Sequence, residues 1–126
     1  MKLIDHLIKL RNKYVTRQVN QIVIPQFDSS KNIREHVVFS GRVQNIGFRM
    51  EVFLLATKLG LTGWVMNRDD GSVEAEFQGA QLKIEFLIQY MKSLIRAKVK
   101  TLTIEPADLI QNEKVFCMNE DNNTIL

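Results

Sequence analysis

The chain has 126 residues, and 45% of them are hydrophobic, which is the size and composition of one globular domain. Its single cysteine, Cys117, excludes an intramolecular disulfide, and no apolar run reaches the ~18 residues that a membrane-spanning helix needs. The first residues, MKLIDHLIKLRNKY, are interrupted by charges, unlike the apolar core of a secretory signal. These features predict a cytoplasmic protein without stable membrane insertion.

The positive charge of the chain is concentrated at its N-terminus. Residues 1–20 contain five basic residues and one acidic residue, a net charge of +4, so the remaining residues together carry −1 of the total of +3. A nucleic-acid-binding protein usually spreads positive charge over its folded domain. This distribution therefore argues against nucleic acid as a partner.

The first fifteen or so residues are predicted to form an amphipathic helix with a basic polar face, because Leu3, Leu7, Leu10 and Tyr14 recur at helical spacing. A helix of this length usually needs a surface to pack on. The candidates are its own domain, a second subunit or a membrane surface. Residues 21–24 are predicted to be extended, and a polar link follows Pro25, so residues 1–34 are interpreted as an N-terminal extension.

From Glu35 onward the sequence alternates between the periods of strands and helices. The predicted elements are a strand at 35–40, a helix at 48–59, strands at 62–67 and 72–78 joined by an Asp70-Gly71 turn, a helix that Gly79 and Ala80 open and that continues to about Leu94, a strand at 98–104 and a short strand at 114–118, after an irregular link containing Pro106. This order is the split βαβ arrangement of ferredoxin-like folds. We therefore predict an α+β ferredoxin-like βαββαβ domain over residues 35–120, with two helices on one face of an antiparallel sheet, and a C-terminal tail at 121–126.

The stretch 41–49, GRVQNIGFR, has the features of a phosphate-binding loop. It precedes a predicted helix that begins near Phe48, so its backbone N–H groups would lie at a helix N-terminus, where the dipole favours an anion. Arg49 adds a guanidinium that can bind two phosphate oxygens. A cation in the first turn opposes the dipole by a few tenths of a kcal/mol up to about 1 kcal/mol, and a bound anion would remove this conflict. The alternative is a solvated arginine whose stem covers apolar surface.

GRVQNIGFR, the segment GLTGWVMN that ends at Asn67, and the following DGSVEAEFQG together resemble the acylphosphatase family from about Glu35 to Glu120. The resemblance implies the ferredoxin-like fold and the hydrolysis of acyl phosphates to a carboxylate and inorganic phosphate, which would be both product and competitor. It implies that Arg49 binds the phosphate and that Asn67 orients the attacking water. The implied phosphate-binding loop consists of Gln44, Asn45, Ile46, Gly47, Phe48 and Arg49.

One residue departs from the family pattern, and it keeps other functions open. Asn45 stands where the family usually has glycine; asparagine tolerates a positive φ best among the other residues, but its side chain could narrow the pocket. A non-catalytic phosphate-binding or protein-interaction module on the same fold is therefore the alternative to an enzyme. RNA binding is a weaker third hypothesis, because the central strands lack aromatic residues of the type that stack on bases.

No metal or other cofactor is expected. No His pair, Cys cluster or carboxylate motif has the spacing of metal ligands. An acyl phosphate is already activated, so positioning a water and stabilising charge on phosphoryl oxygens supply much of the catalysis. Two other conspicuous side chains, Trp64 and Cys117, are interpreted as buried residues of predicted strands.

Overall fold

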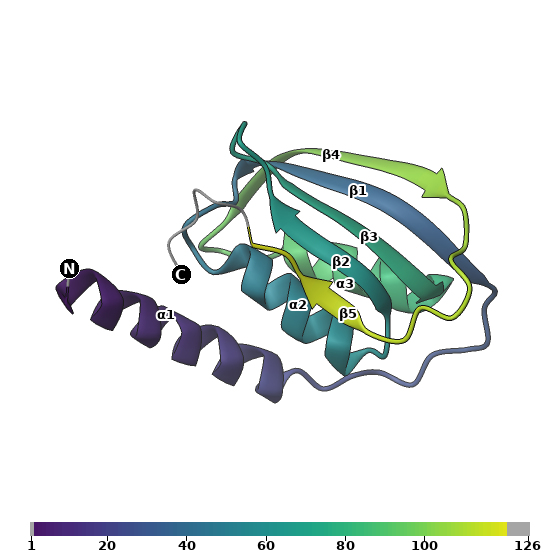
Figure 1. The fold of residues 1–126 in the computed structure, drawn as a ribbon. Helices are drawn as coiled ribbons and strands as arrows, with labels where there is room; N and C mark the ends of the chain where they lie inside the picture. The colour runs from purple at the N-terminus through teal and green to yellow at the C-terminus, as the bar shows by residue number, and fades with distance from the viewer. Residues whose placement is uncertain (1, 121–126) are drawn as a thin grey trace.

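The computed structural model describes residues 2–120, and the predicted C-terminal tail at 121–126 lies outside the described residues. In chain order the elements are α1 (Lys2–Gln21), β1 (Asn32–Arg42), α2 (Phe48–Lys58), β2 (Thr62–Asn67), β3 (Val73–Ala80), α3 (Gln81–Lys92), β4 (Lys98–Ala107) and β5 (Phe116–Met118). One five-stranded sheet forms a layer, and α2 and α3 lie across one of its faces (Figure 1). Within the described residues, no helix combines the length and the apolar character needed to cross a membrane.

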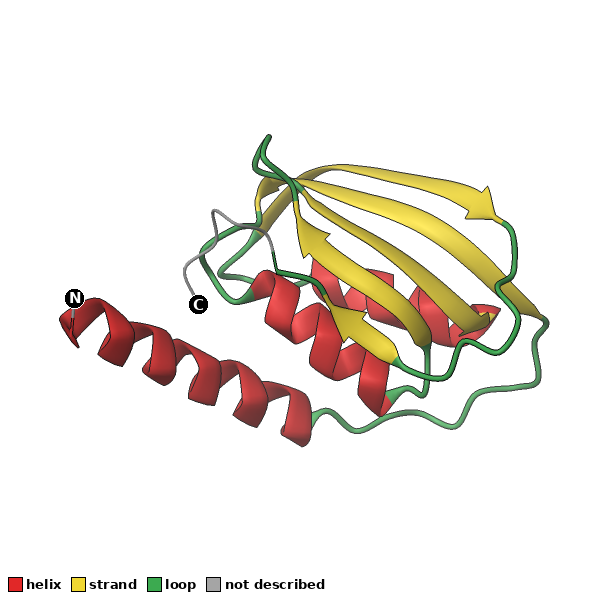
Figure 2. Cartoon of the chain, viewed as in Figure 1, coloured by secondary structure: helices red, strands yellow, loops and turns green. Residues whose placement is uncertain are grey.

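The sheet has the strand order β4-β1-β3-β2-β5. β1 pairs antiparallel with β3 and β4, and β2 pairs antiparallel with β3. With both helices on the same face, this is the predicted ferredoxin-like α+β arrangement (Figure 2). The four strands of this arrangement are antiparallel, as predicted, and β5 adds a parallel pairing with β2 at one edge.

The hydrophobic core lies between the sheet and the two helices. Alternate residues of each central strand point into it, since side chains on a strand alternate between the two faces. Phe39 of β1 and Phe77 of β3 are fully buried, and Phe39 packs edge-on against Phe48 in the first turn of α2, with ring centroids 5.1 Å apart. This packing holds the start of α2, and with it the preceding loop, against the sheet.

α1 is longer than predicted, because its C-terminal half packs on the domain. Val15 and Val19 are buried against the domain. Lys58, at the end of α2, donates hydrogen bonds from Nζ to the carbonyls of Val19 at 2.9 Å and Ile22 at 2.7 Å, which satisfies carbonyls at the helix end that have no intrahelical donor. Gln21, the first residue of the piece predicted to be extended at 21–24, is therefore the last residue of this helix. The N-terminal half of α1 projects beyond the domain, with Leu3 and Leu7 exposed (Figure 1).

Several strand ends differ from the predicted ones. β1 begins at Asn32. Gly79 and Ala80, which were predicted to open the second helix of the domain, are the last residues of β3, and α3 begins after them at Gln81. β4 continues to Ala107 and includes Pro106, which was predicted to lie in an irregular link. β4 is an edge strand, where proline is tolerated because one side of the strand has no partner that needs an N–H.

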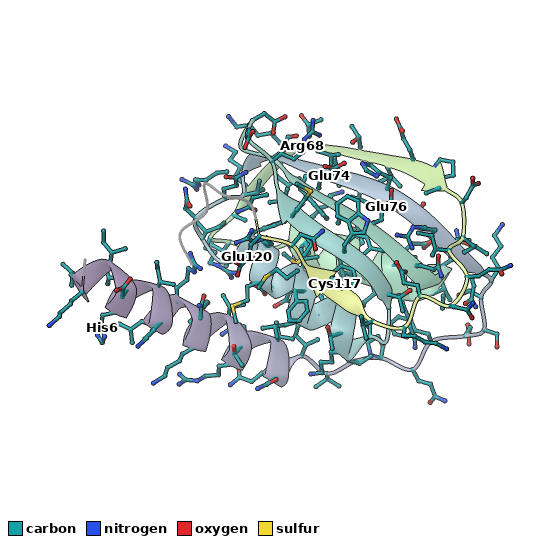
Figure 3. The ribbon with its side chains drawn as sticks, viewed as in Figure 1. His6, Arg68, Glu74, Glu76, Cys117 and Glu120 are labelled. Atoms are coloured by element: carbon teal, nitrogen blue, oxygen red, sulfur yellow. The ribbon has the colours of Figure 1, made fainter. Side chains whose placement is uncertain are left out.

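The face of the sheet opposite the helices carries polar and charged side chains. Nε2 of His36 lies 2.8 Å from a carboxylate oxygen of Glu74 and Nδ1 lies 2.8 Å from one of Glu76, and Arg34 donates from Nε to Glu76 at 2.6 Å. Glu74 and Glu76 follow one another along this face of β3 (Figure 3). Trp64 lies on this same face, half-buried, with its ring edge-on to His36, so its prediction as a core residue was wrong.

The prediction for Cys117 was also wrong, because its side chain is exposed. β5 has only three residues, and their side chains alternate between the two faces of the sheet. Phe116 is the residue that points inward and stacks on Phe77, with ring centroids 5.6 Å apart.

The charged network on the open face makes stability depend on pH. Burial alone would raise the pKa of the Glu76 carboxyl, but hydrogen bonds from His36 and Arg34 outweigh it and hold that pKa below its ordinary value of 4.5. A carboxyl with a lowered pKa stabilises the fold above its unfolded pKa and loses this contribution as the pH falls through the folded pKa.

We expect Glu76→Gln to lower the free energy of unfolding at pH 7 by about 1–2 kcal/mol, because two charge-assisted hydrogen bonds are weakened. The difference from the native chain should shrink below pH 4.5, the ordinary pKa of this carboxyl. Urea denaturation at pH 7 and at acid pH measures both values. Glu105→Gln, an exposed carboxyl on β4, is the matched control. A difference that stays constant with pH would contradict this assignment.

Candidate active site

The loop between β1 and α2 has the backbone conformation that its residues allow. Asn45 has a positive φ of 65°, as the sequence predicts it should tolerate, and its side chain is exposed. Gly47 is the residue before the first turn of α2, with a φ of 82° and no side chain that could cap the helix. The first N–H groups of α2 have no intrahelical acceptor, and within residues 2–120 no side-chain hydrogen bond caps this helix end, so the groups are available to an anion.

Gln44 ties this loop to the turn of the β2–β3 hairpin. Its side-chain Nε2 donates to the carbonyl of Arg68 at 2.7 Å and to the carbonyl of Ser72 at 2.8 Å. The turn is closed by a hydrogen bond from the Arg68 N–H to the Ser72 carbonyl at 2.9 Å. The loop is therefore held beside Asn67, which directly precedes Arg68. The side-chain nitrogen of Gln44 is occupied by this contact, so only its backbone is left for a phosphate.

Arg49 lies in the first turn of α2 and is buried, with 3% of its surface exposed. Its Nη1 donates to the carbonyl of Asn119 at 3.1 Å. The Asn119 N–H donates in turn to the carbonyl of Val65 in β2 at 2.8 Å. The guanidinium of Arg49 is thus linked through Asn119 to Val65 of β2, which lies two residues before Asn67.

Asn67 ends β2 and points to the same side of the sheet as Val65, since both are buried at alternate positions of the strand. This is the side that α2 covers, so Arg49 and Asn67 lie on one face and at one end of β2. Within residues 2–120, the side-chain Oδ1 of Asn67 is buried and accepts no hydrogen bond. A buried acceptor without a donor costs about 1–3 kcal/mol, and it calls for a ligand or water to supply the proton.

A charged network on the far side of the loop holds its backbone. Arg96, between α3 and β4, donates from Nε to the carbonyl of Ile46 at 2.9 Å and from Nη2 to the fully buried carboxylate of Glu51. Tyr90 of α3 donates its hydroxyl to the other oxygen of Glu51 at 2.8 Å. Burial and the charge of Glu51 raise the pKa of the Tyr90 hydroxyl, so it remains a donor.

Of the residues in the sequence-predicted loop, Ile46 and Phe48 direct their side chains into the core or against it, and their backbones belong to the loop. The structure also adds Arg96 and Asn119, which sequence reasoning missed. Along the sequence, both residues lie 50 or more positions from their partners in the loop, and only the folded chain brings them into contact. Among residues 2–120, no group of three or more His, Cys, Asp or Glu side chains is placed to hold a metal ion.

Comparison with known proteins identifies this arrangement. The family model for acylphosphatase matches residues 35–118. The acylphosphatase of Geobacillus kaustophilus is 44% identical over 84 residues, which are 66% of this chain and 89% of that protein. The acylphosphatase of Thermoplasma volcanium is 43% identical over 82 residues, covering 63% and 91% of the two chains. The crystal structure of acylphosphatase from Bacillus subtilis matches with a TM-score of 0.64 and 30% identity, over 69% of this chain and 98% of that one.

The fold and these matches define a ferredoxin-like hydrolase domain. The chain belongs to the acylphosphatase family, and its activity is the hydrolysis of acyl phosphates. The matched residues contain the whole loop, Arg49 and Asn67.

The network behind the loop can be tested by removing one hydroxyl. We expect Tyr90→Phe to lower the free energy of unfolding by about 1.5–3 kcal/mol, because a buried carboxylate loses one of its hydrogen bonds. Tyr14→Phe is the control: Tyr14 is half exposed and contacts Arg96 through its ring, with the guanidinium 5.6 Å from the ring centroid. That variant should stay within about 0.5 kcal/mol of the native chain. Equal effects of both substitutions in chemical denaturation would contradict the assignment.

Proposed function

We propose that the loop at 44–49 binds the phosphoryl group of an acyl phosphate through its backbone N–H groups and Arg49, and that Asn67 orients the attacking water. The observation that carries this proposal is the buried Oδ1 of Asn67, which has no donor within the described residues. A water molecule that donates a hydrogen bond to this oxygen satisfies it and keeps a lone pair for phosphorus. The side-chain nitrogen of the same amide can donate to a phosphoryl oxygen.

The reaction needs positioning and charge stabilisation rather than a side-chain nucleophile. The water oxygen forms a bond to phosphorus while the bond between phosphorus and the acyl oxygen breaks, and the carboxylate leaves with the bonding electron pair. A phosphoryl oxygen of the substrate accepts the proton of the water. Negative charge on the phosphoryl oxygens is stabilised by donors that the fold has already oriented.

The burial of Arg49 supports its role as the phosphate ligand. A guanidinium in the first turn of a helix lies against the positive end of the helix dipole. Arg49 holds this position while 97% buried, so water cannot offset the conflict as it would at the surface. A phosphoryl dianion bound between Arg49 and the amides of α2 turns both effects into attraction.

The setting of the reaction follows from the same features. The substrate is a small acyl phosphate, and inorganic phosphate is both product and competitor for the loop. The single cysteine and the near-neutral charge of the residues after position 20 support a cytoplasmic protein that binds no nucleic acid and does not insert stably into membranes.

We expect Arg49→Ala and Asn67→Ala each to lower the turnover of a synthetic acyl phosphate by on the order of 10²-fold or more, since each removes a group that acts on developing charge or on the water. Phosphate release from the native chain and both variants is the measurement. Arg68→Ala removes an exposed guanidinium next to Asn67 and should keep native turnover. Turnover that survives in both site variants, or is absent from the native chain, would end the proposal.

Asn45 gives a separate test of the loop. Because Asn45 already has the left-handed conformation and an exposed side chain, we expect Asn45→Gly to leave turnover nearly unchanged. Asn45→Val should destabilise the chain by roughly 1–2 kcal/mol, because a β-branched residue lacks the short polar side chain that lets asparagine adopt a positive φ, and should lower turnover. A large rise in turnover for Asn45→Gly would show instead that the asparagine impairs the pocket, as the non-catalytic alternative requires.

A further inference from the structure

The N-terminal helix brings a further guanidinium to the phosphate-binding loop. Gly47 packs directly against α1: a Cβ at this position would lie 2.8 Å from Cγ2 of Val15 and 3.4 Å from both Cδ and Nε of Arg11. Arg11 is one helical turn before Val15, so the two side chains lie on the same face of α1. Arg11 therefore lies beside Gly47 of the loop, and Gly47 is two residues before Arg49 in the chain.

Three guanidinium groups gather at this loop. Burial lowers the pKa of Arg11 first, and the positive charges of Arg49 and Arg96 lower it further, so both of these groups lie within electrostatic range of Arg11. Arg96 is neutralised by the carboxylate of Glu51. Among residues 2–120, Arg11 takes part in no ion pair; its guanidinium donates to the neutral Oδ1 of Asn12 at 3.1 and 3.3 Å.

Within the described residues, the positive charge of Arg11 has no carboxylate partner, because Glu51 pairs with Arg96. An anion bound at the loop would supply such a partner, since Nε of Arg11 lies 3.4 Å from the position of a Cβ at Gly47. The planar fork of an arginine suits two phosphate oxygens, and its charge is permanent.

We propose that Arg11 is a substrate-binding residue, which supplies a second guanidinium to the phosphoryl group of the substrate and to inorganic phosphate. This inference rests on the proposed function of the loop and extends it to residues outside the segment 35–118 that the family model matches. The position of Arg11 depends on the docking of α1 through Val15, Val19 and Lys58. The N-terminal extension is thus part of the phosphate site.

The test compares Arg11→Met with Arg17→Met. Methionine keeps an apolar stem against Gly47 and removes the charge; Arg17 is on the same helix with an exposed side chain and gives the same change in net charge. Isothermal titration calorimetry with inorganic phosphate gives a Kd, and phosphate release from a synthetic acyl phosphate gives KM and kcat. For Arg11→Met we expect Kd and KM to rise about tenfold, which corresponds to about 1.4 kcal/mol, with kcat changed much less. Arg17→Met should resemble the native chain.

Arg11→Lys separates binding from packing, because lysine restores the charge without the planar fork. It should recover part of the phosphate affinity, whereas a purely structural role would lower kcat together with the thermal stability. Native Kd and KM in Arg11→Met, or equal losses in Arg17→Met, would overturn the inference. If the native chain hydrolyses acyl phosphate while Arg11→Met binds phosphate normally, only this inference fails. If phosphate binding depends on Arg11 but the native chain shows no turnover, the proposed function fails and the role of Arg11 stands.

Discussion

The proposed anion site depends on a short loop whose backbone must hold one conformation. Two contacts with distant parts of the chain fix it: the side chain of Gln44 donates to carbonyls of the β2–β3 turn, and the carbonyl of Ile46 accepts a hydrogen bond from Arg96. Arg96 is in turn oriented by the buried carboxylate of Glu51. These contacts use the side chain of Gln44 and the carbonyl of Ile46. The backbone N–H groups of the loop are left to donate to a ligand.

The site also concentrates features that a fold without a ligand would disfavour. Arg49 is a buried cation at the positive end of α2, Asn45 has a left-handed backbone, and the Oδ1 of Asn67 has no donor in the described residues. The position of Arg49 in the helix dipole costs a few tenths of a kcal/mol up to about 1 kcal/mol, and the other two features cost about 1 kcal/mol or more each. They occur within one corner of the molecule, and the proposed water would supply the donor that Asn67 Oδ1 lacks. Local rules of stability are expected to fail at functional sites for this reason.

Most of the fold was predictable because its signals are local. The helix of 48–58 follows from apolar spacing and from glycines at both ends, and the hairpin follows from Asp70-Gly71 between alternating strands. The errors arose where tertiary contacts decide. Packing against α2 extends the first helix to Gln21, an edge position lets β4 include Pro106, and the alternation of a three-residue strand exposes Cys117. Arg49 and Asn67 were predicted as site residues from ordered motifs. Arg96, Asn119 and Arg11 reach the loop only through the folded chain, and no short-range pattern marks them.

The N-terminal extension lies outside the matched family segment, although its helix packs on the domain. The matched family segment begins at residue 35 and contains the loop, Arg49 and Asn67. The residues that are proposed to orient the water and to bind the phosphoryl group in the domain therefore lie outside α1. Of the five basic residues in the first twenty, Arg11 is the one that contacts the loop, while Lys2, Lys9, Lys13 and Arg17 are exposed. A charge that is added beside a complete site, rather than within it, changes how strongly an anion is held more than how fast it reacts. In the role proposed for Arg11, the extension affects the affinity of the site, whereas the chemistry remains that of the acylphosphatase domain.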